Sequence, residues 1–143
     1  MAERPEATVR PVDESEATGR AAAIFADIKA TKRLDFVPRF WRVLATDPDH
    51  LESVWGRLKA TMHPEAVGRV GRLDPLTREI IALAVSATNG CPYCVQSHTA
   101  AARKLGLGVE ALGEVMAVVG LFNSTNAVAH GYQIEPDVFP PQD

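Results

Sequence analysis

Apolar residues recur at steps of three and four through most of the chain, which is the period of an amphipathic α-helix. Proline and glycine residues mark the boundaries between these segments. The pattern predicts helices over about 13–33, 38–46, 50–62, 75–87, 92–105 and 109–130. We find no strand-like alternation, internal repeat or low-complexity segment in the sequence. The predicted fold class is therefore all-α.

Residues typical of helix ends support several of these boundaries. Asp13, with Glu16 three residues later, predicts an N-cap for the first helix. Asp74 stands before a proline where the N-cap of the fourth helix belongs. An Asn-Gly pair ending at Gly90 predicts a left-handed exit from that helix, and Cys91 is then the cap residue of the next one.

The helix predicted over 75–87 is apolar on almost every side, so we expect it to be buried all round. A 143-residue monomer offers little cover for such a helix, which favours an oligomer. The flanking segments differ, because 1–12 reads as an extended arm and 132–143 is a proline-rich tail that cannot continue a helix. The whole chain, 1–143, is interpreted as one domain with these two extensions.

Composition narrows the classes of function. A chain that is 46% hydrophobic can bury a core without a disulfide or a metal. The formal net charge is −3 and no basic block is present, so nucleic acid is not an expected partner. The polar N-terminus lacks the apolar core of a signal peptide, and we expect no apolar run long enough to span a bilayer. The prediction is a cytoplasmic protein without a membrane partner.

The chain has two cysteines, and they form a C-x-x-C motif in "NGCPYCVQSHTAAARKLG". In a reducing compartment this motif indicates redox or metal chemistry ahead of a permanent crosslink. Cys91, Cys94 and His98 fall on one stripe of the predicted helix, which continues in small apolar residues and Leu105. The first turn of a helix stabilises a thiolate, and an imidazole one turn from Cys94 can accept its proton.

Glu79 is the other candidate site residue, because its helix face otherwise carries Leu76, Leu83 and Ser86. A carboxylate on such a face needs a partner or a proton. The next helix follows after a short turn, so the two helices are expected to form an antiparallel hairpin in which Glu79 can approach His98.

Other interpretations remain open from the residues alone. The cysteine pair could bind zinc, with His98 and Glu79 completing four ligands, or it could be inert and buried. Glu79 could form an ordinary salt bridge with Arg72 or Arg103. His98 could be a satisfied core histidine.

The combined motif resembles a known superfamily. Glu79, eleven intervening residues, Cys91-Pro-Tyr-Cys94, three more residues, His98 and then Gly106 are similar to the dithiol peroxidase branch of the alkylhydroperoxidase D and carboxymuconolactone decarboxylase superfamily. The resemblance implies a helical bundle with the C-x-x-C motif at the start of a core helix. It implies a homo-oligomer, either a trimer or a hexamer built from dimers.

The resemblance also implies an activity. A small hydroperoxide would be reduced without a tightly bound cofactor or metal, and an external dithiol, such as a lipoyl group or a lipoylated protein, would restore the cysteines. Cys94 would attack the peroxide, Cys91 would condense with it, and Glu79 with His98 would relay protons. Position at the helix start alone favours Cys91 as the nucleophile, but His98 is one turn from Cys94 and two from Cys91.

One residue departs from the pattern of the best-known members, because Tyr93 stands where they have a histidine between the cysteines. The natural peroxide and the reductant are therefore not fixed by the motif. Two alternatives remain: a lyase like carboxymuconolactone decarboxylase, a branch that lacks the cysteine pair, and a non-enzymatic redox-sensing or metal-sensing oligomer.

Overall fold

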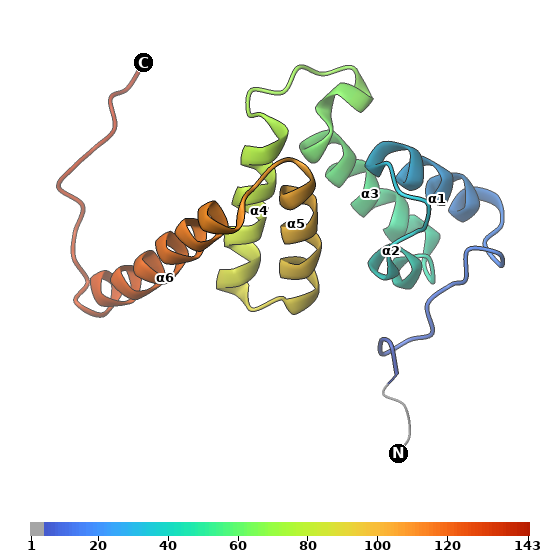
Figure 1. Ribbon diagram of the computed structural model, residues 1–143, viewed down its shortest axis with the longest axis horizontal. Coiled ribbons are helices and arrows are strands. Elements are labelled where there is room, and N and C mark those ends of the chain that lie inside the picture. The colour runs from blue at the N-terminus through green and yellow to red at the C-terminus, as the bar shows by residue number, and fades with distance from the viewer. Residues whose placement is uncertain (1–4) are drawn as a thin grey trace. The chain divides into compact units, whose positions relative to one another are not determined.

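The computed structural model describes residues 5–143, and all regular secondary structure in that range is helical (Figure 1). The all-α prediction is therefore confirmed. Residues 1–4 of the predicted arm lie outside the described residues, while 5–12 and the tail from 134 onward contain no helix or strand. The elements in chain order are α1 (Gly19–Lys32), α2 (Arg39–Leu44), α3 (Pro48–Met62), the 3₁₀ helix η1 (Pro64–Val67), α4 (Pro75–Asn89), α5 (Pro92–Lys104) and α6 (Val109–Gly131).

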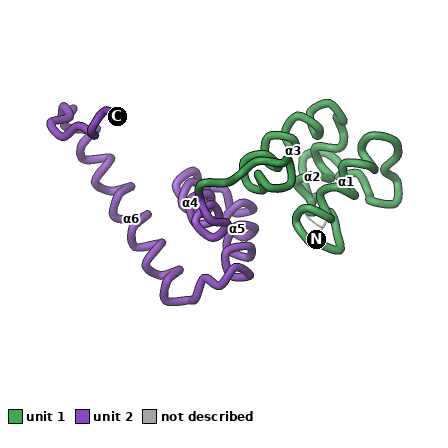
Figure 2. The backbone as a smooth tube through the Cα atoms, turned by 90° about the horizontal axis from the view of Figure 1, so that it is seen from above, with its two compact units in different colours: residues 1–72 green, residues 73–143 purple. Residues whose placement is uncertain are grey.

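The chain divides into two compact units, Met1–Arg72 and Leu73–Asp143 (Figure 2). In the first unit, α1, α2 and α3 enclose an apolar core whose aromatic centre is Trp41 and Trp55, packed edge to face with ring centroids 5.2 Å apart. The other buried members of this core are Ala21, Ile24, Phe25, Ile28, Val37, Ala45 and Leu51. The apolar face predicted for the first helix thus forms one wall of a real core.

A carboxylate joins α1 to α3 at the edge of this core. Asp27 accepts hydrogen bonds from Trp55 Nε1 at 2.7 Å and from Lys59 Nζ at 2.8 Å. Burial pushes the pKa of Asp27 upward, but the hydrogen bonds from Lys59 and Trp55 outweigh it, so the net pKa is lowered. The ionised carboxylate therefore stabilises the contact between the two helices.

The start of α1 differs from the prediction. Asp13 is not its N-cap, because the helix begins at Gly19 and Thr18 is the cap residue. The Asp13 carboxylate instead accepts from the backbone N–H of Ser15 at 2.9 Å and from the Ser15 hydroxyl at 2.6 Å. Such local side-chain bonds offer the backbone a turn in place of a helix. Residues 14–16 therefore form a turn ahead of α1.

Glu14, in that turn, fastens it to the rest of the first unit. Its carboxylate accepts from the backbone N–H of Val37 at 2.6 Å and from Lys29 Nζ at 3.0 Å. These two bonds, the one from Val37 first, lower the pKa of Glu14. The turn is thereby held by a charge that is present only above the pKa of this carboxyl.

The second unit is built on the α4–α5 hairpin, and here the predicted end signals are confirmed. The Asp74 side chain accepts from the backbone N–H of Thr77 at 2.9 Å and caps α4. Gly90 ends that helix with φ of +69°, a left-handed conformation that suits glycine. Cys91 is the N-cap of α5. The two helices therefore run antiparallel, side by side (Figure 1).

Within this chain α4 is buried on one face only, contrary to the expectation of burial all round. Glu79, Leu83 and Ser86 are its buried residues, whereas Ile81 and Val85 on another face are 49% and 53% exposed. Leu83 of α4, Ala102 of α5 and Leu107 after α5 are the buried apolar residues of the second unit within the described range. Part of the apolar surface on the other faces of α4 thus stays exposed in the single chain.

Helix α6 has no buried residue, and its far end leads away from the hairpin (Figures 1 and 2). Its 23 residues include a window with mean hydropathy of 1.2, so by length and composition alone it is long and apolar enough to cross a membrane. The expectation that no apolar run reaches that length is therefore wrong.

Candidate active site

The two cysteines are joined at the start of α5. Cys91 and Cys94 form a disulfide with an S–S distance of 2.03 Å. As N-cap of the helix, Cys91 accepts a hydrogen bond from the backbone N–H of Cys94 to its Sγ atom at 3.2 Å. The sulfurs therefore lie against the N-terminal N–H groups of α5, where negative charge on a sulfur is stabilised when the pair is reduced.

The backbone before the motif fixes the position of Cys91. Its N–H donates to the carbonyl of Ser86, in the last turn of α4, at 3.1 Å. The left-handed conformation of Gly90 makes this tight reversal possible. The first cysteine is thus attached to the end of one helix while it caps the next.

Glu79 and His98 meet across the hairpin. The Oε2 atom of Glu79 lies 2.7 Å from Nδ1 of His98, and their side chains are only 11% and 24% exposed. In a pair of ionised carboxylate and neutral imidazole the carboxylate can only accept, so Nδ1 is then the donor in this bond. The other ring nitrogen of His98 then has a free lone pair. The contact that the spacing permitted is present, and Glu79 uses it in place of a salt bridge with Arg72 or Arg103.

The stripe predicted on α5 is present, with one change at its end. Cys91, Cys94 and His98 are all partly buried, and Ala102 further along is fully buried. Leu105 is 46% exposed, whereas Leu107, two residues further on, is buried. Tyr93, between the cysteines, is also 43% exposed. The disulfide and His98 are therefore neither fully buried nor fully exposed.

Ser86 lies on the same face of α4 as Glu79 and is a buried polar residue that no predicted function uses. It is 7% exposed, and its hydroxyl donates to the carbonyl of Ala82 at 2.6 Å. A serine among apolar residues at a seven-residue step from Glu79 was the signal in the sequence that pointed to it.

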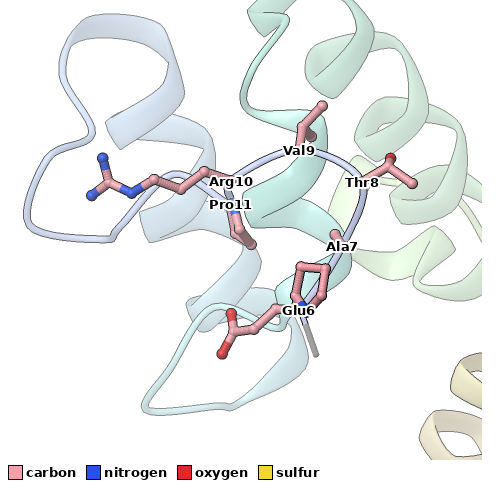
Figure 3. Close-up of a pocket in the computed structure, with 7 residues that line it drawn as sticks. Glu6, Ala7, Thr8, Val9, Arg10 and Pro11 are labelled. Carbon is pink, nitrogen blue, oxygen red and sulfur yellow. The ribbon is translucent and has the colours of Figure 1, made fainter. Parts of the chain in front are cut away.

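Two surface hollows lie elsewhere among the described residues. One, of about 440 Å³, is formed by residues 5–11 of the arm alone (Figure 3), where Glu6 pairs with Arg39 and Arg10 pairs with Glu16. The other, of about 400 Å³, is an open groove between α4 and α6. Within residues 5–143 no group of three or more His, Cys, Asp or Glu side chains is arranged to hold a metal ion. The joined sulfurs are not thiolate ligands in this state.

Comparison with known proteins identifies the family and the fold of the chain. Residues 58–134 match the model of the carboxymuconolactone decarboxylase family. A solved structure described as the alkylhydroperoxidase AhpD core from Rhodospirillum rubrum is 46% identical, with a TM-score of 0.85, and the match covers 92% of this chain and 95% of that one. The predicted resemblance is therefore confirmed at the level of family and fold.

Two curated relatives have different names. An alkyl hydroperoxide reductase AhpD of Solibacter usitatus is 31% identical over 80% of this chain and 61% of its own length. An (R)-2-haloacid dehalogenase of Pseudomonas putida is 32% identical over 78% of this chain but only 35% of its own length. The chain thus spans between one third and about three fifths of these relatives. The chain belongs to the carboxymuconolactone decarboxylase family, in the superfamily that also holds the alkylhydroperoxidase D proteins.

Proposed function

We propose that this protein is a thiol-dependent peroxidase of the alkylhydroperoxidase type that uses Cys91 and Cys94 as its redox pair. The observation that carries the proposal is the 2.7 Å bond between Glu79 and His98, on the same hairpin as the disulfide. A buried carboxylate that orients an imidazole one turn from a cysteine is the arrangement that activates a thiol nucleophile. The relatives named AhpD support the same class of reaction.

The reaction begins with the reduced pair. The Cys94 thiolate attacks one oxygen of a hydroperoxide, the O–O bond breaks, and the alcohol leaves with one proton while Cys94 becomes a sulfenic acid. The Cys91 thiol then attacks the Cys94 sulfur, water is released, and the disulfide forms. An external dithiol gives two electrons and two protons to this disulfide and is itself oxidised. A lipoyl group is one reductant with that chemistry.

Glu79 and His98 supply the proton transfers. With its Nδ1 proton donated to Glu79, His98 presents its other ring nitrogen as a base for the Cys94 thiol. The imidazolium that forms is stabilised by the Glu79 carboxylate and can return its proton to the departing alkoxide. We assign the attack to Cys94 because His98 follows it by four residues, one helical turn, whereas Cys91 is two turns away.

Cysteine variants test the assignment directly. The chain has two cysteines, so each Cys→Ser variant leaves one thiol to follow. Cys94→Ser should abolish consumption of an organic hydroperoxide with dihydrolipoamide as reductant. Cys91→Ser should react once and hold a sulfenic acid at Cys94, seen by mass as a single dimedone adduct. If the adduct forms in Cys94→Ser instead, Cys91 is the nucleophile. If the fully reduced wild type consumes no hydroperoxide with any dithiol, the peroxidase proposal fails.

We also infer that α6 and the open face of α4 are covered by further copies of this chain, in a trimer or a hexamer of dimers. In support, α6 exposes Val118, Leu121 and Phe122 at more than half of their surface, beside the exposed Val85 of α4. A lipid environment suits this helix less well, because Asn, Ser, Thr and His residues occupy its second half.

Sedimentation of a matched pair of variants tests the assembly. Phe122→Asp should lower the mass in solution toward that of a single chain. Val70→Asp replaces an equally apolar residue that is 86% exposed outside α4 and α6, and it should leave the mass unchanged. A wild-type protein that sediments as a monomer at all concentrations would refute the assembly.

A further inference from the structure

The described part of the chain has two buried polar residues, and both lie on one face of α4. Glu79 is 8% exposed and Ser86 is 7% exposed. They are seven residues apart, which is two helical turns or about 10 Å along the axis. Glu79 is paired with His98, whereas the proposed reaction gives the Ser86 hydroxyl no function.

The backbone places Ser86 next to the first cysteine. Its carbonyl accepts the Cys91 N–H at 3.1 Å, so the two residues are bonded neighbours at the turn between the helices. The hairpin is antiparallel, and Glu79 lies opposite His98. Ser86 lies two turns closer than Glu79 to the C-terminal end of α4. This end of the hairpin is also where α5 begins and where the disulfide lies.

The hydroxyl has hydrogen-bonding capacity beyond its present bond. In the disulfide state it donates to the carbonyl of Ala82 at 2.6 Å, and its oxygen keeps acceptor lone pairs. A disulfide sulfur has no proton to donate. Once the pair is reduced, a Cys91 thiol that turns toward this hydroxyl has a proton to donate to the serine oxygen, and a thiolate can accept from the hydroxyl when it rotates away from Ala82. The hydroxyl thus offers the reduced state bonds that the oxidised state cannot use.

We infer that Ser86 is a positioning residue that acts through Cys91 to favour the reduced form of the cysteine pair and so raises the reduction potential of the disulfide. This inference rests on the proposed redox function of the pair. In the reaction concerned, the Cys91–Cys94 bond breaks, the two sulfurs take up two electrons and two protons, and the dithiol that supplies them closes to a disulfide.

The experiment equilibrates the full-length protein with mixtures of reduced and oxidised dithiothreitol, traps free thiols by alkylation, and reads the oxidised fraction by mass. Ser86→Ala should lower the equilibrium constant for reduction by about fivefold to tenfold, as expected for one hydrogen bond of about 1 kcal/mol. A tenfold change in a two-electron couple corresponds to about 30 mV. Alanine is well tolerated in a helix, so the variant is expected to fold.

Two further variants separate the hydroxyl from packing. Ser86→Thr keeps a hydroxyl at the same place and should restore the wild-type constant to within about twofold. Ser97→Ala removes an exposed hydroxyl from α5 and should leave the constant unchanged. A wild-type constant for Ser86→Ala would overturn the inference, as would an equal shift in Ser86→Thr or in Ser97→Ala. Peroxide is absent from this measurement, so a failure of the peroxidase proposal leaves the result for Ser86 readable.

Discussion

Replacing Glu79 with glutamine tests how much the buried carboxylate contributes to thiol oxidation. Glutamine has nearly the same shape, and its side-chain oxygen can still accept the Nδ1 proton of His98 over the 2.7 Å contact. The change therefore removes the negative charge and keeps a hydrogen bond. In the proposed mechanism, the loss falls on the stabilisation of the imidazolium that forms when His98 takes the thiol proton.

The size of the effect follows from the kind of bond. Hydrogen bonds to a charged group contribute about 1.5–3 kcal/mol, against about 0.5–1.5 kcal/mol for neutral pairs. The Glu79 side chain is only 11% exposed, so solvent screens this difference little. A loss of about 1–1.5 kcal/mol corresponds to a roughly fivefold to tenfold slower reaction. His98→Ala removes the base itself and should slow the reaction by about 10² to 10⁴.

The assay is single-turnover oxidation of the reduced protein by an organic hydroperoxide, quenched with an alkylating reagent and read by mass. The double variant Glu79→Gln, His98→Ala should be no slower than His98→Ala alone, because the carboxylate acts only through the imidazole. Glu114→Gln, at an exposed glutamate of α6, serves as the matched control and should react at the wild-type rate. Multiplicative losses in the double variant, or an unaffected rate in His98→Ala, would refute the proton relay.

Three further predictions concern stability, measured as the free energy of unfolding in urea. Asp27→Asn should cost about 1 kcal/mol, since it weakens charge-assisted bonds from Lys59 and the carboxylate is 42% exposed. The unfolding free energy should decrease as the pH is lowered in the acid range, because folding lowers the pKa of Glu14 below its ordinary 4.5. The contribution of Glu14 is complete above pH 4.5 and is lost as the pH drops through the pKa of the folded state. Gly90→Ala should cost about 1 kcal/mol at φ of +69°, whereas Gly56→Ala in α3 should gain a similar amount.

Each of these stability predictions has a contrasting variant. Asp35→Asn, at an exposed aspartate outside the helices, should leave the unfolding free energy within about 0.5 kcal/mol of wild type. Glu14→Gln should flatten the acid dependence, and an unchanged slope would show that Glu14 is not ionised in the turn. If Gly90→Ala is as stable as the wild type, the left-handed exit from α4 is not required in solution.

The sequence predicted best where short-range chemistry decides the structure. The Asp74 cap, the Gly90 exit and the start of α5 at Cys91 follow from side chains and backbone conformations within a few residues of each other. The contact between Glu79 and His98 could be predicted for a similar reason, because a tight turn between two helices makes them pack antiparallel. These features specify both the hairpin and the candidate site on it.

Prediction was weaker where two local solutions compete or where cover comes from outside the segment. Asp13 can cap a helix or close a turn, and the hydroxyl of Ser15 favours the turn. An all-round apolar pattern in α4 shows that its faces avoid water but not what covers them. The buried position of Ser86 depends on the packing of α5, so periodicity alone gave it no function.

The exposure of helix α6 affects how readily its backbone opens. No side chain of α6 is fully buried, so the helix depends largely on its own backbone bonds and intrinsic propensity, and Gly113 and Gly120 in its interior weaken that propensity. In the monomeric protein, the amide protons of α6 should therefore exchange with deuterated water sooner than those around Leu83 in α4. The slowest-exchanging amides of the second unit should then lie in the α4–α5 hairpin. The cysteines are therefore held on the part of the unit that opens least often.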